Sequence, residues 1–135
     1  MVQWSVWGWG LGVFLGMGGA IAQIAPDGTL GTESTIVTPI NQLRDQIEGG
    51  AIRGANLFHS LREFNIGAGR EVYFANPTGI ENILTRVTGS ARSEILGTLG
   101  VLGNANLFLI NPNGIVFGAN ARLDLRGSFL ASTAN

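Results

Sequence analysis

The segment NLFLINPNGIVFGANARLDLRG, residues 106–127, decides how the chain can fold. It contains three short runs, at 107–110, 115–117 and 121–126, whose composition is typical of β-strands. Only Asn-Pro-Asn-Gly and Gly-Ala-Asn separate these runs, which is too little chain for helical crossovers. The strands therefore either fold back as an antiparallel meander or wind in one direction, so that each pass of the chain stacks on the one before.

Composition sets the outer limits on fold and chemistry. The chain has 135 residues, of which 45% are hydrophobic, and this is enough for one domain with a core. A net charge of -1 gives no basic surface, so we expect no nucleic-acid partner. Cysteine and lysine are both absent, which excludes disulfides, thiolate nucleophiles, sulfur-ligated zinc, P-loop lysines and Schiff-base lysines.

Residues 1–22 carry no charged side chain and are largely apolar, which predicts a signal peptide. Ala20 and Ala22 match the A-x-A pattern that precedes signal peptidase cleavage, so we expect cleavage between Ala22 and Gln23. The general secretion machinery and signal peptidase are then expected partners. The alternative is a transmembrane anchor over 6–22, a span barely long enough when about 20 residues are needed.

The segment after the signal peptide is predicted to be an extended arm. Residues 24–39 are rich in turn-forming residues, and the β-branched run at 35–38 predicts one strand. Leu43 and Ile47 then have the i, i+4 spacing of a single helical turn, which the following glycines would end. Residues 55–67 fit either a helix or a strand, and the β character of the rest of the chain favours extended structure.

Alternation of apolar and polar residues is clearest in ARLDLRGSF, residues 121–129. Leu123, Leu125 and Phe129 fall on one face, which predicts a half-buried strand. Burial of each of these three side chains is expected to contribute about 1.5–3 kcal/mol. Glycines spaced three apart in GTLGVLG, residues 97–103, indicate tight bends or a close approach of neighbouring backbone.

Two short sequences recur along the chain. GANLF at 54–58 returns as NANLF at 104–108, and ANPTGI at 75–80 returns as INPNGI at 110–115. In Asn-Pro-x-Gly, proline fixes φ for the second position of a turn, the asparagine before it can bond the backbone ahead, and glycine accepts a positive φ. We therefore expect rigid corners at Asn76, Pro77, Thr78 and Gly79, followed by Ile80, and at Asn111, Pro112, Asn113 and Gly114, followed by Ile115. A plain β-turn without a further role is the alternative for either motif.

Short strands, rigid corners and inward apolar residues together predict a parallel β-helix. In that fold each turn of the chain is a flat coil, paired with the coils on either side, and both ends of the stack are unpaired edges that need covering. The extended arm is expected to form an N-terminal β cap. Residues 130–135 contain no corresponding cap, so we expect a stack that is incomplete at its C-terminal end.

Four segments carry a resemblance to a known family: NLFHSLREFNIG, FANPTGIENILTRVTG, ILGTLGVLGNANLFLINPNGIVFG and LDLRGSFLAST. Together they resemble the N-terminal secretion domain of filamentous haemagglutinin-like exoproteins of two-partner secretion systems. The sequence at 111–115 is the family's NPNGI motif, whereas 76–79 departs from the family's Asn-Pro-Asn-Leu. The resemblance implies an all-β, right-handed, single-stranded parallel β-helix of the pectin-lyase type, with residues 23–135 forming an incomplete secretion domain.

The resemblance also implies a function in secretion. Chains of this family cross the inner membrane on a signal peptide and present this domain to a dedicated outer-membrane β-barrel transporter, which passes them to the cell surface or the medium. From the residues we infer in addition that the two corners bias the first coils towards their register and so act as a folding nucleus.

Two other classes of function, an enzyme and an adhesin, are the alternatives to secretion. A carbohydrate-active enzyme needs clustered acids, but the nine acids here are scattered, and Asp124 alternates with Arg122 and Arg126 as on a solvated strand face. His59, the single histidine, is expected to be packed or hydrogen-bonded rather than to act as a base. We therefore expect no enzyme activity, no catalytic or metal-binding residues and no cofactor. The alternative function is a small surface adhesin whose outward polar side chains bind host or surface glycans.

Overall fold

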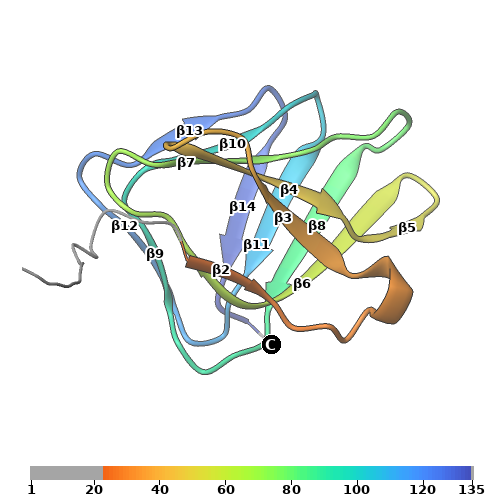
Figure 1. Cartoon of the computed structure of the whole chain (residues 1–135), viewed down its shortest axis with the longest axis horizontal. Helices are drawn as coiled ribbons and strands as arrows, with labels where there is room; N and C mark the ends of the chain where they lie inside the picture. Colours follow the sequence, from red (N-terminus) through yellow and green to blue (C-terminus); the bar gives the residue numbers. More distant parts are fainter. Residues whose placement is uncertain (1–22, 135) are drawn as a thin grey trace, which may run out of the picture.

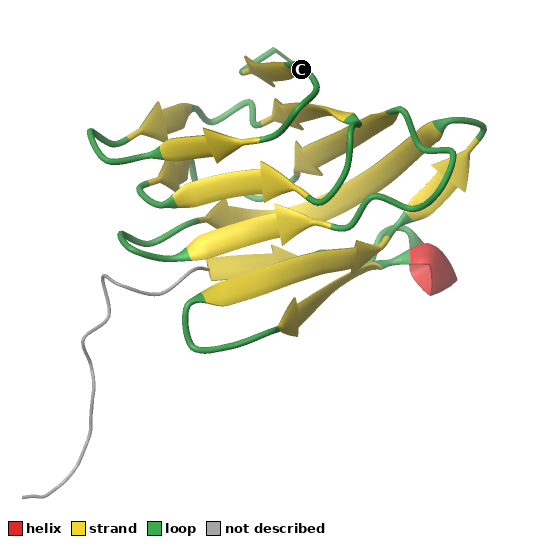
Figure 2. Ribbon diagram, turned by 90° about the horizontal axis from the view of Figure 1, so that it is seen from above, coloured by secondary structure: helices red, strands yellow, loops and turns green. Residues whose placement is uncertain are grey.

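The computed structural model describes residues 23–134 and shows an all-β parallel solenoid of about four turns. Figure 2 shows the turns as layers, stacked from the N-terminal strands to the C-terminus. The chain therefore winds and stacks, and the antiparallel meander is excluded. The strands are β2 (Gln23–Pro26), β3 (Thr35–Pro39), β4 (Arg44–Gly49), β5 (Ala51–Arg53), β6 (Asn56–Asn65), β7 (Glu71–Phe74), β8 (Asn82–Val87), β9 (Ser93–Ile95), β10 (Thr98–Val101), β11 (Asn106–Ile110), β12 (Ile115–Phe117), β13 (Arg122–Asp124) and β14 (Phe129–Ser132), with one 3-10 turn at Gly31–Glu33.

The coils present three sheets, which Figure 1 shows in a view close to the solenoid axis. The first sheet has the order β13-β10-β7-β4-β3, the second has β14-β11-β8-β6-β2, and the third has β12-β9. We number the coils by their strands: β4 and β6 form coil 1, β7 to β9 form coil 2, β10 to β12 form coil 3, and β13 and β14 form coil 4. All neighbouring coils pair in parallel.

Asparagines at the start of the second-sheet strands fix the register between coils. Asn82 Nδ2 donates to Asn56 Oδ1 at 3.0 Å, and Asn106 Nδ2 donates to Asn82 Oδ1 at 3.0 Å, across separations of 26 and 24 residues. The Ser128 amide continues the series by donating to Asn106 Oδ1 at 2.8 Å. The recurrence of GANLF as NANLF is therefore a repeat over two coils, and the coil between them carries the equivalent Asn-Ile-Leu at 82–84.

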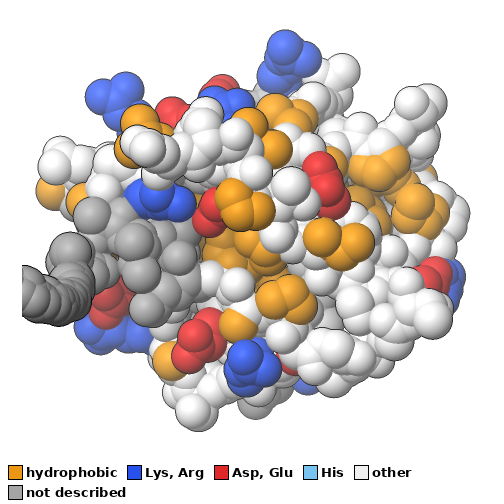
Figure 3. Space-filling view, in the orientation of Figure 1, with side chains coloured by type: hydrophobic (Ala, Val, Ile, Leu, Met, Phe, Trp, Pro, Cys, Tyr) orange, Lys and Arg blue, Asp and Glu red, His pale blue; other side chains and the backbone are white. Residues whose placement is uncertain are grey.

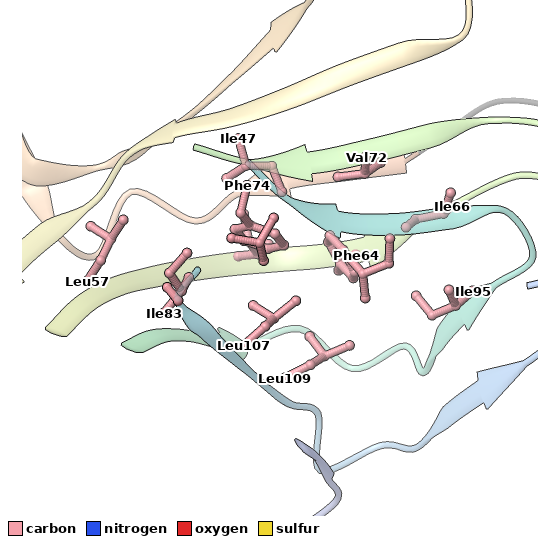
Figure 4. Close-up of a cluster of buried hydrophobic side chains, with 14 of the residues drawn as sticks. Ile47, Leu57, Phe64, Ile66, Val72, Phe74, Ile83, Ile95, Leu107 and Leu109 are labelled. Atoms are coloured by element: carbon pink, nitrogen blue, oxygen red, sulfur yellow. The ribbon is translucent and has the colours of Figure 1, made fainter. Parts of the chain in front are cut away.

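Inward side chains stack in columns from coil to coil and make the core. Leu57, Ile83 and Leu107 lie in one register on the second sheet, and each is at most 1% exposed. Figure 4 shows them facing Val72 and Phe74, which come from the first sheet. Each such side chain stabilises the fold by about 1.5–3 kcal/mol, so the core supplies the force that holds the coils together.

An antiparallel cap covers the first coil, as the sequence predicted. β3 pairs with β4 and β2 pairs with β6, both antiparallel, and β5 forms a hairpin with β6. These strands pair with the edges of coil 1, which would otherwise be free to pair with another chain. Figure 3 views the molecule from the side of the cap, where hydrophobic side chains lie in small groups among polar and charged ones. In residues 23–134, the structure contains no helix long and apolar enough to cross a membrane.

The helical turn predicted at Leu43 and Ile47 is wrong, because this segment forms β4. Ile47 is fully buried, whereas Leu43 is 58% exposed and precedes the strand. The i, i+4 spacing was therefore accidental, and pairing with β3 and β7 determines the structure of the segment. The extended interpretation of 55–67 and the strand at 35–38 are confirmed by β6 and β3.

The single half-buried strand predicted over 121–129 is also wrong. The chain forms β13, turns a corner at 125–128 and continues as β14 on another sheet. Leu125 and Phe129 pack against the core, but Leu123 is 48% exposed. Leu123 stacks on the buried Leu99, and in the described residues no further coil covers it. The burial expected for Leu123 on the inner face of the strand is therefore not found.

Asp27 connects the cap to two coils through hydrogen bonds. Its carboxylate accepts hydrogen bonds from Ser60 Oγ and Thr88 Oγ1, each at 2.6 Å, and from the amide and hydroxyl of Thr29. Partial burial alone would raise the pKa of Asp27, but the hydrogen bonds from Ser60, Thr88 and Thr29 outweigh it and lower the pKa well below its usual range. The ionised form is thus the one that the folded cap stabilises.

We expect Asp27→Asn to lower the free energy of unfolding by about 1–2 kcal/mol at neutral pH, since one anionic acceptor serves four donors. Because folding lowers this pKa, the contribution is complete above the ordinary carboxyl pKa and is lost as the pH falls below it. Urea denaturation at neutral and acidic pH measures the difference. Glu33→Gln is the matched control, because Glu33 is a cap carboxylate whose ion pair with Arg53 is exposed. An equal effect of the two substitutions would contradict the assignment.

Candidate functional site

The corner at 111–114 joins β11 to β12 and is a well-formed β-turn. The Gly114 amide donates to the Asn111 carbonyl at 3.1 Å, so Asn111 is the first residue and Pro112 the second. Asn111 Oδ1 accepts from the Asn113 amide at 2.9 Å. Gly114 has φ +117, a conformation that favours glycine. Each residue of the motif therefore has the position in the turn that its chemistry favours.

Asn111 is fully buried and connects three coils. Its Nδ2 donates to the Ala91 carbonyl at 3.1 Å and to Ser93 Oγ at 3.0 Å, both in coil 2. Its backbone amide donates to the Ser132 carbonyl of coil 4 at 2.9 Å. A buried side-chain amide with all of these partners fixes the position of the corner between its neighbours.

The rest of the motif continues the same connection to coil 2. Asn113 Nδ2 donates to the Gly89 carbonyl at 2.7 Å, and the Gly114 carbonyl accepts from the Ser93 amide at 3.0 Å. Ile115 then begins β12 and packs, half-buried, against the core. The corner is thus bonded to the loop beneath it at three of its four residues.

The corner at 76–80 has a similar sequence but forms a different turn. Here the Ile80 amide donates to the Pro77 carbonyl at 3.1 Å, so Pro77, not Asn76, is the first residue of the turn. Gly79 is then the third residue, with φ +86, and Thr78 is the second. Ile80 is 7% exposed and enters the core. The expectation that proline takes the second position therefore fails for this motif.

Asn76 lies before its turn and contacts coil 3. Its Oδ1 accepts from the Ala105 amide at 2.9 Å, and its Nδ2 donates to the Ile80 carbonyl at 3.1 Å. A Cβ added to Gly103 would lie 2.4 Å from Asn76 Oδ1, so the side chain needs glycine above it. The close approach predicted for the glycines at 97–103 is found at this position.

The two motifs do not occupy equivalent positions in the solenoid. The corner at 76–80 leads from the first sheet to the second, whereas the corner at 111–115 leads from the second to the third. Their spacing of 35 residues therefore matches no whole number of coils, unlike the asparagine separations of 24 and 26.

The predicted signal cleavage site lies at the edge of the described residues. Gln23 begins β2, and Ala22 lies outside the described residues.

Tyr73 forms a strut along the outer face of the first sheet that the sequence did not reveal. Its ring covers Gly100, where an added Cβ would lie 2.3 Å from Tyr73 Cε2, and its hydroxyl donates to Asp124 Oδ2 at 2.5 Å. Arg44 lies over the ring, 4.0 Å from the centroid, and its Nε donates to Glu71 at 2.9 Å. Burial, with the bond to Asp124 adding to it, raises the pKa of Tyr73 to about 12. The strut thus links all four coils.

Two shallow hollows, of about 260 and 350 Å³, lie beside Tyr73 and Asp124. Arg44 and Arg126 line the smaller one, and Glu71 and Arg122 line the larger one. Within residues 23–134 there is no group of three histidine, aspartate or glutamate side chains that could hold a metal ion. Beside these hollows, Arg44 bonds Glu71 of the next coil and Tyr73 bonds Asp124 of coil 4.

His59 points into the core from β6 and is 2% exposed. Its Nδ1 lies 2.9 Å from Thr35 Oγ1 of the cap, and its ring lies 5.4 Å from that of Phe74, centroid to centroid. Among residues 23–134, neither its Nε2 nor the adjacent Thr85 Oγ1 has a hydrogen-bond partner. Burial lowers the pKa of His59 to about 4. The expected packed, hydrogen-bonded histidine is confirmed.

Comparison with known proteins gives one family and one fold. The family model described as "TPS secretion domain" matches residues 22–135. The chain is 36% identical over 66 residues to a heme/hemopexin-binding protein of Haemophilus influenzae strain Rd, and 35% identical over 72 residues to another from the same species. These matches cover 49% and 53% of the chain, which spans only 7% of each relative's length.

A solved structure, the crystal structure of filamentous hemagglutinin secretion domain, has a similar fold. It superposes with a TM-score of 0.59 at 23% sequence identity, over 74% of this chain and 39% of that one. The predicted resemblance and the solenoid architecture are both confirmed.

Proposed function

The chain belongs to the TPS secretion domain family, and from this premise we propose that it targets a two-partner secretion exoprotein to an outer-membrane β-barrel transporter and nucleates its folding. A TPS secretion domain is a non-catalytic module with a role in two-partner secretion, and exoproteins of this family are typically secreted or found at the cell surface. The family match over residues 22–135 carries the proposal. The signal peptide at 1–22, with cleavage after Ala22, would bring the chain to the periplasm.

The geometry of the corner at 111–114 supports the nucleating role. Coil 3 cannot take its register without placing Asn111 against Ala91 and Ser93 of coil 2, and Ser132 of coil 4 then pairs with the Asn111 amide. Coils that form in this order outside the outer membrane oppose return of the chain, because burial and pairing would have to be undone. No nucleotide is needed for such forward movement.

The wild-type chain, co-expressed with a transporter of the family, is expected to reach the medium or the cell surface, and its secretion should fail without the transporter. The folded domain or its unfolded precursor should also co-purify with the periplasmic part of that transporter. Export that is independent of the transporter would contradict the recognition step. Binding of glycans in preference to the transporter would favour the adhesin alternative instead.

We expect Gly114→Val to impair folding and secretion together. A β-branched residue at φ +117 costs about 1–3 kcal/mol, although the new Cβ would meet only Arg92 Cβ, at an ordinary 3.6 Å. Gly79→Val is the matched variant, since Gly79 has φ +86 and open space around it but lies in the other kind of turn. Arg122→Ala, at an exposed position, should change little.

The secreted yield and the urea midpoint of each of these variants distinguish a specific effect on nucleation from a general loss of stability. If the corner at 111–114 is the nucleus, Gly114→Val reduces secretion more than Gly79→Val does for the same loss of stability. Secretion of Gly114→Val at the normal yield would count against the proposed nucleus.

The two curated relatives are named as heme/hemopexin-binding proteins, and we do not propose this binding for the present chain. The chain spans about 7% of their length, and its single histidine is buried against Thr35 and Phe74, where it is inaccessible as an axial ligand of heme. In the part of the chain that the structure describes, the observations favour a secretion module over a ligand-binding one.

A further inference from the structure

The corner at 111–114 contains the single Asn-Gly pair of the sequence, Asn113 and Gly114. An asparagine loses its side-chain amide most readily before glycine, because glycine has no Cβ to obstruct attack by its own backbone nitrogen. In a freely rotating chain, the nitrogen of Gly114 can reach Cγ of Asn113. The contacts of the folded corner decide whether it can do so in the native domain.

The fold engages both of the groups that would react. The Gly114 amide donates to the Asn111 carbonyl at 3.1 Å. Asn113 Nδ2 donates to the Gly89 carbonyl at 2.7 Å and to Asn111 Oδ1 at 3.2 Å. Attack on Cγ would break the hydrogen bond of the turn and draw the side-chain amide away from coil 2. The reaction therefore requires that the corner open first.

We propose that Asn113 is a site of spontaneous deamidation in the unfolded chain, and that the folded corner protects it. The Gly114 nitrogen forms a bond to Cγ of Asn113, the bond from Cγ to Nδ2 breaks, and Nδ2 leaves as ammonia with the proton of the Gly114 amide. Water then opens the resulting succinimide ring at either of its carbonyls. The products are aspartate and isoaspartate, and water is the only co-reactant.

Neither product fits the folded corner. Aspartate has an oxygen in place of Nδ2, so two acceptors face each other where Asn113 donates to the Gly89 carbonyl. Isoaspartate adds a methylene group to the backbone within the turn, which displaces the Gly114 amide from the Asn111 carbonyl. Modification of an unfolded chain thus disfavours its folding, whereas a folded chain is spared. The reaction marks chains by the time that they have spent unfolded.

The test compares the purified chain under native conditions and in concentrated urea, at the same mildly alkaline pH and temperature. Mass spectrometry of proteolytic peptides measures aspartate and isoaspartate in place of Asn113. We expect deamidation to be slower in the folded chain by about a hundredfold or more, because it proceeds only through the small opened fraction. Gly114→Ala should slow the reaction severalfold in urea, since the added Cβ obstructs the attack. Equal rates in the two conditions, or no reaction at Asn113 in urea, would overturn the proposal.

Refolding tests separately whether the products are excluded from the corner. A chain held in urea until part of it is deamidated is diluted into buffer, and size-exclusion chromatography isolates the folded fraction. Unmodified Asn113 should be enriched in that fraction. Asn113→Asp should lower the urea midpoint more than Asn113→Ala, which removes the same donor without adding an acceptor. Equal modification of the folded and unfolded fractions, or equal midpoints of the two variants, would contradict the exclusion. Neither measurement involves a transporter, so both are independent of the proposed function.

Discussion

Asn111→Ala is expected to lower the free energy of unfolding by about 3–5 kcal/mol, since it leaves a small cavity and removes the partners of several buried polar groups. The Ala91 carbonyl and Ser93 Oγ lose their donor, and the Asn113 amide loses its acceptor. The loss is a large fraction of the stability of a small domain. Urea denaturation followed by circular dichroism measures it, and secretion through the transporter should fall in parallel.

Asn76→Ala is the matched control for this substitution. Asn76 has the same side chain before a proline and also bonds a neighbouring coil, but it is half-buried and water can replace its partners. We expect it to cost about 1 kcal/mol. Equal losses at the two positions would show that burial of Asn111 is not what makes its corner important.

Acidification should destabilise the domain through His59 at a higher pH than through Asp27, whose pKa is lowered. The pKa of His59 is lowered from 6.5 to about 4 by burial, so the unfolded chain takes up its proton first as the pH falls. The stabilisation that comes from neutral His59 is complete above about pH 6.5. Between about pH 6.5 and about pH 4 it decreases, by about 3 kcal/mol in total. Urea midpoints measured across this window should fall accordingly.

His59→Gln provides the control for the pH effect. Glutamine keeps a group able to bond Thr35 Oγ1 but does not titrate, so the slope between pH 6.5 and 4 should flatten. The loss of stability that arises from protonation of Asp27 occurs only below the ordinary carboxyl pKa, and it should remain in the His59→Gln variant. A wild-type slope that survives in His59→Gln would assign the transition to another group.

The stacked coils could be predicted from the sequence because the strands of the central coils have a local sequence pattern that is typical of strands. The runs at 107–110 and 115–117 became β11 and β12 within a residue, and the short connections excluded helices. The pattern failed at the ends of the stack. Leu123 alternates correctly but is 48% exposed, because its burial depends on a neighbouring coil and not on its own strand. Periodicity describes a side chain's direction, whereas burial also depends on what lies opposite.

The site could be predicted only in part for a similar reason. Turn chemistry located the corner at 111–114, since each of its residues has a local preference. The same chemistry misplaced the corner at 76–80, where Asn76 bonds Ala105 of the next coil and the turn starts one residue later. The strut from Tyr73 to Asp124 spans 51 residues and has no local signal except the glycine at 100, which the ring covers.

The asparagine series in the second sheet has an evolutionary consequence. Asn82 and Asn106 each donate to the asparagine of the preceding coil, so the excision or duplication of one interval would rejoin the same pair of side chains in this series. At the asparagines of the second sheet, a gene for such a fold can therefore lengthen or shorten by modules of 24 to 26 residues with the same hydrogen bond re-formed. Insertions of other lengths would put an asparagine out of step and leave its amide unmatched.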